Sequence, residues 1–129
     1  MSSFTTRLII EDLDGINFRI HEPFIYYEGE LGSECWVEVP VGFVTDFAST
    51  PKFLWRIVPP TGIYGKAAVV HDYLCVHRTM IRNGEVVTLT RKECDRIFLE
   101  AMEVLKVPKW KRHAMYSGVR AYAIVKGIK

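Results

Sequence analysis

The hydrophobic period of the chain changes near residue 48, and no other feature limits its fold as strongly. Residues 16–20 and 35–39 alternate apolar and polar side chains, which is typical of strands with one buried face. Asp-Gly at 14–15 and the segment 28–30 indicate turns between strands. Pro40 ends the strand at 35–39. The first 48 residues therefore predict an antiparallel β meander.

After residue 48 the patterns are those of helices. Ser49-Thr50-Pro51 predicts the start of a short helix over 52–57. Further helices are expected from 63 or 66 to about 78, from a capping box at 90–93 onward, and from 108 to about 126. Asn83-Gly84 predicts a hairpin between two of them.

We therefore expect an α+β fold: an N-terminal antiparallel β meander followed by three to four helices, two of them packed antiparallel around His71 and Asp95. Residues 1–129 should form a single domain, with 1–48 mainly β and 49–129 mainly helical, since 129 residues suffice for one core.

The overall charge gives no clear nucleic-acid signal, because the net charge is only +2. The basic residues are concentrated in the C-terminal third, which favours either an anionic surface or, more often, the solvated side of a helix. We expect no signal peptide and no membrane span. Three cysteines without metal-ligand spacing predict reduced thiols.

The pair His71-Asp72 is the main candidate for chemistry. Adjacent helical residues point about 100° apart, so these two side chains are suited to separate tasks. Asp95, at the start of the next helix, can reach back to His71 if the helices pack antiparallel, and a carboxylate-held imidazole is a general base near neutral pH. In the commoner alternative, His71 is a buried histidine satisfied by Asp95, and Asp72 faces solvent.

Asp46 is a further candidate. An Asp ahead of a capped helix usually accepts hydrogen bonds from backbone N–H groups. In the functional interpretation it joins Asp72 at a shared metal or substrate site.

Three blocks resemble a family of small uncharacterised proteins of tailed phages and prophages. They are Gly42-Phe43-Val44-Thr45-Asp46-Phe47-Ala48-Ser49-Thr50-Pro51, Ala67-Ala68-Val69-Val70-His71-Asp72-Tyr73-Leu74, and Glu93-Cys94-Asp95-Arg96-Ile97-Phe98-Leu99-Glu100-Ala101-Met102. They stand in the family's order, and the likeness spans about residues 35 to 122. It implies a phage origin, in the virion or the host cytoplasm, and carries no activity.

The spacing of His71-Asp72 and Asp95 is also similar to the core of secreted and parvoviral phospholipase A domains. That resemblance implies His71 as the base that activates water, Asp95 as the residue that orients it, and Asp72 as a calcium ligand. Carbonyls of a loop at 60–65, with Gly62 and Gly65, would complete the calcium site. Cys75 stands where those enzymes have a tyrosine that holds the distant Asp.

Three functions remain open at this point. The chain can be a phage-encoded, calcium-dependent hydrolase of lipid esters, whose partner is a lipid or membrane surface. It can be a virion component of the tail, neck or baseplate with a degenerate site, bound to other virion proteins or to itself through Phe24, Tyr26, Trp36 or Trp55. It can also be an early phage factor that binds a host protein.

Overall fold

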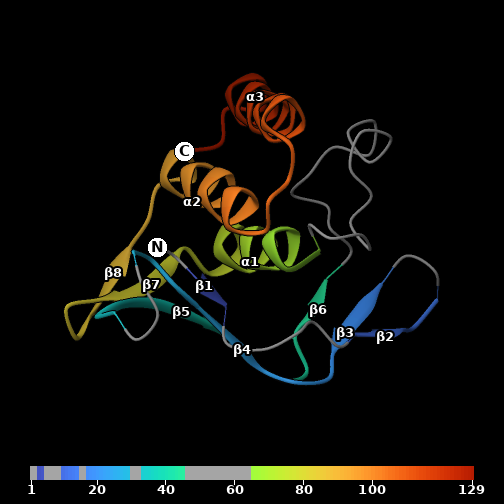
Figure 1. The fold of residues 1–129 in the computed structure, drawn as a ribbon, viewed down its shortest axis with the longest axis vertical. Coiled ribbons are helices and arrows are strands. Elements are labelled where there is room, and N and C mark those ends of the chain that lie inside the picture. Colours follow the sequence, from blue (N-terminus) through green and yellow to red (C-terminus); the bar gives the residue numbers. More distant parts are fainter. Residues whose placement is uncertain (1–2, 5–9, 15–16, 30–32, 46–64) are drawn as a thin grey trace.

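The computed structural model describes residues 3–4, 10–14, 17–29, 33–45 and 65–129. Strands come first, and the helices α1 (Gly65–His77), α2 (Arg91–Val104) and α3 (Lys109–Val125) follow, which confirms the expected α+β class (Figure 1). The helix expected over 52–57 lies outside the described residues.

The strands form two antiparallel sheets. The five-stranded sheet has the order β1 (Ser3–Phe4), β4 (Phe24–Tyr27), β5 (Cys35–Val39), β7 (Thr79–Arg82) and β8 (Glu85–Thr88). The three-stranded sheet has the order β2 (Ile10–Asp12), β3 (Phe18–Ile20) and β6 (Val44–Thr45). All strand pairs are antiparallel.

The N-terminal strands are antiparallel as expected, but they divide between two sheets, and one of these sheets also takes up a later hairpin. The hairpin β7–β8 follows α1 in sequence, yet β7 pairs with β5, with Cys35 opposite Arg82 and Trp36 opposite Ile81. This pairing covers a side of β5 that would otherwise be a bare strand edge. Such a long-range partner leaves no trace in the local hydrophobic period.

The β7–β8 turn matches its sequence signal. Asn83 and Gly84 both have positive φ, 52° and 80°, as the favoured two-residue hairpin turn requires. The strand after it, expected over 85–89, is observed over Glu85–Thr88.

The core extends from the five-stranded sheet through α1 to α2 and α3. Val37 and Val39 of β5 are buried as expected, and the ring of Phe43 contacts Tyr73 of α1 with centroids 5.2 Å apart. Figure 1 shows α1 between this sheet and α2, which explains why residues 67–72 are buried on every side of the helix.

Two further helices complete the stack. Thr90 and Glu93 form the expected capping box at the start of α2, and Gly127, with φ of 68°, follows the end of α3. α3 packs on α2 through Met115, Val119 and Ala123, so the order is sheet, α1, α2, α3 (Figure 1). In the described part of the chain, no helix is long and apolar enough to span a membrane.

Candidate functional site

His71 lies in the middle of α1 and is fully buried. Its neighbours on the helix are Ala68, Val69 and Val70, small and apolar side chains that allow close packing on both sides of α1. The imidazole ring therefore points into the layer between α1 and α2.

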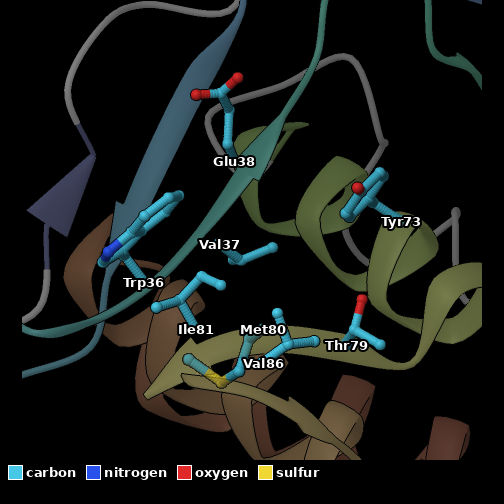
Figure 2. A pocket seen from close by; sticks show the side chains of 8 residues that line it. All are labelled: Trp36, Val37, Glu38, Tyr73, Thr79, Met80, Ile81 and Val86. Carbon is cyan, nitrogen blue, oxygen red and sulfur yellow. The ribbon is translucent and has the colours of Figure 1, made fainter. Parts of the chain in front are cut away.

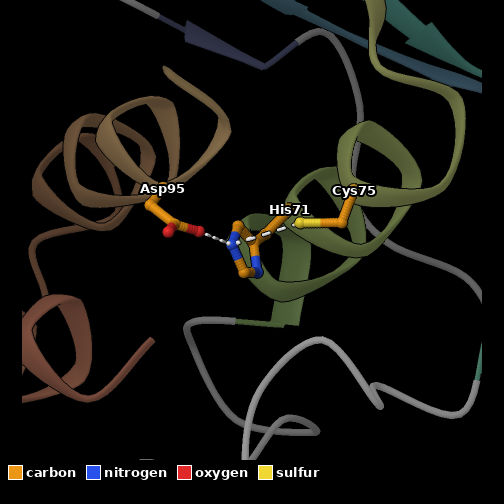
Figure 3. A group of neighbouring side chains, drawn as sticks. All are labelled: His71, Cys75 and Asp95. Carbon is orange, nitrogen blue, oxygen red and sulfur yellow. Dashed lines mark hydrogen bonds and ion pairs between the residues drawn. The ribbon is translucent and has the colours of Figure 1, made fainter. Parts of the chain in front are cut away.

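The expected contact between His71 and Asp95 is present. The His71 Nε2 and Asp95 Oδ1 atoms are 2.6 Å apart, within hydrogen-bond distance (Figure 3). One turn further along α1, the carbonyl oxygen of Leu74 accepts a hydrogen bond from the thiol of Cys94, with 3.6 Å between Sγ and the oxygen. The contacts of the two helices thus run in opposite chain directions, so α1 and α2 are antiparallel.

Phe98 fixes the plane of the imidazole ring. Its own ring stacks on that of His71, with centroids 4.3 Å apart and planes 22° apart. Asp95 and Phe98 are one helical turn apart and lie on the same side of α2. Asp95 therefore contacts the edge of the imidazole ring while Phe98 stacks on its plane.

Two arginines bind the same carboxylate. Arg91 donates from Nε to Asp95 Oδ1 at 2.9 Å, and Arg120 of α3 donates to Asp95 Oδ2 at 2.8 Å. Sequence reasoning missed both. The spacing of four residues between Arg91 and Asp95 is a detectable helical ion-pair signal, whereas Arg120 comes from a helix whose packing no local pattern shows.

These contacts set the protonation of the pair. Burial disfavours an ionised Asp95, but its hydrogen bonds with His71 and Arg91 and the positive charge of Arg91 outweigh burial and lower the pKa of this carboxyl. Burial lowers the pKa of His71, against the opposing influence of Asp95, so the ring is neutral at neutral pH. Because an ionised carboxylate only accepts, Nε2 carries the proton and the imidazole lone pair is on Nδ1.

Asp72 is buried, at 6% exposure, and does not face solvent as the structural alternative expected. It accepts a hydrogen bond from the hydroxyl of Thr45 in β6, which ties α1 to the smaller sheet. Its negative charge also raises the pKa of His71, although burial prevails. The two adjacent side chains have separate partners, as their helical geometry predicts.

Cys75 lies beside the pair. Its Sγ atom is 3.5 Å from His71 Nε2, on the other side of the ring from Asp95 in Figure 3. A hydrogen bond with Cys94, followed by burial, raises the pKa of the Cys75 thiol, so it is protonated and a poor nucleophile. Cys35, Cys75 and Cys94 are all free, as expected.

The described residues place three potential metal ligands together, namely His71, Cys75 and Asp95, whose ligand atoms lie within 4.8 Å of one another. A cation does not fit this group. Both oxygens of Asp95 already accept from positively charged guanidinium groups, and Nε2 of His71 carries a proton. Asp72, the expected calcium ligand, is not part of this group.

Of the expected calcium loop at 60–65, the structure describes Gly65, which is the first residue of α1 and is buried. Gly62 and Asp46 lie outside the described residues.

An open pocket of about 200 Å³ lies elsewhere on the molecule, over β5, β7 and β8 beside Tyr73 of α1 (Figure 2). Its lining is largely apolar, with Trp36, Val37 and Met80, and has few polar groups, among them Glu38 and Thr79. His71, Asp72 and Asp95 do not line it, so it is separate from the buried pair.

Comparison with known proteins gives a family without an activity. The family model described as a protein of unknown function, DUF1353, matches residues 18–119 and so includes the whole site. An uncharacterized protein, y4jT, of Sinorhizobium fredii (strain NBRC 101917 / NGR234) is 38% identical over 86 residues, which are 65% of this chain and 23% of that protein. The chain thus spans less than a quarter of this relative. No solved structure matches.

Proposed function

Since the chain belongs to the DUF1353 family, whose function is unknown, we propose a function from the geometry of its site: hydrolysis of an ester, with His71 as general base and Asp95 as its positioning residue. The observation that carries the proposal is the 2.6 Å contact of His71 Nε2 with Asp95, which positions the imidazole as a carboxylate-held base.

The chemistry follows from the tautomer with Nε2 protonated. Nδ1 takes a proton from a water molecule while the water oxygen attacks the ester carbonyl carbon. The resulting imidazolium then returns the proton to the leaving alcohol as the carbon–oxygen bond breaks, which leaves a carboxylic acid and an alcohol. Asp95 stabilises the imidazolium, and Phe98 holds the ring in plane.

Burial and Arg91 set the pH range of such a base. The charge of Arg91 opposes an imidazolium at His71 and adds to the effect of burial. The base form of His71 therefore persists to a pH below 6.5, its ordinary pKa. We expect hydrolysis to remain constant from neutral pH down to this value and to fall only at lower pH.

Calcium is the cofactor that the phospholipase resemblance implies. Asp72 offers the carboxylate oxygen that this ion prefers, but calcium takes six to eight oxygen ligands, and among the described residues Asp72 belongs to no group of three potential ligands. Calcium bound there would polarise the ester carbonyl. The proton transfers assigned to His71 do not depend on it.

The proposed substrate class is a lipid ester, and the proposed origin is a tailed phage or prophage. Both rest on the resemblances: the His71-Asp72 and Asp95 spacing for the substrate, and the order of the three blocks for the origin. A virion component or a host-binding factor is the alternative. Phe24 and Tyr26, which were expected to form its docking surface, are buried in the core and lend it no support.

The test is hydrolysis of a soluble short-chain phospholipid, with calcium and with chelator. His71→Gln should abolish hydrolysis, whereas His77→Gln should not, because His77 is an exposed histidine on the same helix. Asp72→Asn should abolish the calcium-dependent part, and calcium should raise the melting temperature of the wild type but not of this variant.

Two results would reject the proposal. The first is that the wild type shows no hydrolysis, either with calcium or with chelator. The second is that His71→Gln, still folded by circular dichroism, hydrolyses the ester like the wild type. Either result rejects His71 as the general base. Equal melting temperatures with calcium and with chelator reject the metal site alone.

A further inference from the structure

The charge of the chain is divided unequally along the sequence. Residues 104–129 contain no Asp or Glu and seven basic residues: Lys106, Lys109, Lys111, Arg112, Arg120, Lys126 and Lys129. All 15 acidic residues lie in the preceding part, which also holds the other ten basic residues. The strongly basic segment coincides with α3 and its flanks.

The side of α3 opposite its contact with α2 is apolar or small. Its residues follow at spacings of four and three, which place them on one face: Trp110, Ala114, Ser117, Ala121 and Ile124. Trp110 is 66% exposed and Ile124 is 67% exposed, and the next residue, Val125, is 82% exposed. We call this set, with Val125, the outer face of α3.

Lysines lie beside this outer face at the start of α3 and just past its end. Lys109 and Lys126 are exposed near the two ends of the helix, and the Nζ of Lys111 lies 5.5 Å from the centroid of the Trp110 ring. In Figure 1, α3 is the outermost of the described helices and has α2 on one side. A helix with an apolar face, an exposed tryptophan and bordering lysines is suited to lie in the plane of a lipid surface.

We propose that the outer face of α3 binds an anionic lipid surface, with Trp110 and Ile124 at the level of the headgroups and the lysines on their phosphates. This deepens the proposed function by naming the surface that would present a lipid ester, but binding does not require hydrolysis. The charge of α3 decides the occupant: a second copy of the chain would bring another helix without a single acidic residue against it. Nucleic acid is disfavoured because the middle of the face is apolar and the lysines are at its borders.

The test is co-sedimentation with vesicles of equal parts phosphatidylglycerol and phosphatidylcholine, against vesicles of phosphatidylcholine alone. We expect binding only to the anionic vesicles, and weaker binding at high salt. Lys109→Glu combined with Lys126→Glu should weaken it by at least about tenfold, since each lysine near such a surface contributes on the order of fivefold. The matched control, Lys92→Glu with Arg96→Glu on exposed positions of α2, should bind like the wild type.

Tryptophan fluorescence reports the depth of Trp110. Emission should shift to the blue on anionic vesicles, and Trp110→Phe should remove this shift, although Trp36 and Trp55 remain. Because Trp110 is exposed, this variant should keep the wild-type stability.

Several outcomes overturn the proposal. They are no binding to anionic vesicles at low salt, equal binding by the Lys109→Glu/Lys126→Glu variant, binding to a DNA duplex but not to vesicles, or a dimer by light scattering that Trp110→Ala dissolves. The failure of hydrolysis is distinguishable from these outcomes. His71→Gln should bind vesicles normally, and the α3 variants should hydrolyse the soluble ester normally.

Discussion

Replacing Asp95 by Asn is the sharpest perturbation of the buried cluster. The change keeps the size of the side chain and removes its charge. His71 of α1, Arg91 of α2 and Arg120 of α3 all bind this carboxylate, so one substitution weakens the attachment of all three helices to each other.

The magnitude follows from burial. The side chains of Asp95 and Arg91 are 0% and 4% exposed, and that of Arg120 is 20% exposed. Removing one member of a buried ion pair costs about 3–5 kcal/mol, because the remaining charge loses its compensation. We therefore expect Asp95→Asn to lower the free energy of unfolding by about 3–5 kcal/mol, a large part of the about 5–15 kcal/mol typical of a domain.

Urea unfolding followed by circular dichroism measures the effect. Glu11→Gln is the control, since Glu11 pairs with Arg19 at the surface, where both side chains are nearly half exposed, and should cost less than about 1 kcal/mol. Adding Arg91→Met to Asp95→Asn should restore part of the stability, with a coupling of about 0.5–3 kcal/mol. A loss below about 1 kcal/mol for Asp95→Asn would refute the view that this cluster joins the helices.

Substitutions at three further residues and one pH series test other parts of the structure. Thr90→Ala should cost about 1 kcal/mol in urea unfolding, because it removes the capping box of α2; an unchanged value contradicts that role. Phe98→Ala should cost about 3–5 kcal/mol and Phe98→Leu less, since the ring is fully buried against His71; a neutral Phe98→Ala would show that the site does not pack as described. Tyr26→Phe should cost about 0.5–1.5 kcal/mol through loss of its 2.6 Å hydrogen bond to Glu100, and a gain would contradict it. The stability should fall as pH drops below His71's ordinary pKa of 6.5, because the unfolded ring takes up a proton there while the folded ring, with its lowered pKa, does not. The slope should not exceed about 1.4 kcal/mol per pH unit for this proton, and His71→Gln should remove that part of the dependence.

The helical part of the fold was largely predictable, because each helix carries its own local signals. The capping box at Thr90 and Glu93 placed the start of α2, and the last helix was expected over 108 to about 126, so both limits agree with the structure to within one or two residues. The sheet was less predictable. Strand pairing depends on partners far apart in sequence, so the period of residues 35–39 predicted a strand but not its pairing with β7.

The same distinction applies to the site. The contact of His71 with Asp95 could be predicted because both residues carry chemistry and their helices carry clear periods. Arg120 could not, because its approach to Asp95 depends on how α3 packs on α2. Asp72 was expected at a solvent-facing or metal-binding position, and its burial under the hydroxyl of Thr45 depends on the smaller sheet, whose strands are short.

The two proposals meet in α3. The inner side of this helix brings Arg120 to Asp95, and its outer face carries Trp110 and the bordering lysines. Arg120, which binds Asp95 in the buried cluster, therefore belongs to the same helix as the proposed lipid-binding face. If α3 moves when it binds a membrane, the Arg120–Asp95 contact changes with it. The electrostatic influence of Asp95 on His71 then changes as well. Arg120→Met tests this coupling: it should leave vesicle binding unchanged, because Arg120 is mostly buried, and should shift the acidic limit of hydrolysis to higher pH by removing a positive charge from the carboxylate that holds His71. An unchanged pH limit in this variant would show that α3 and the base act independently.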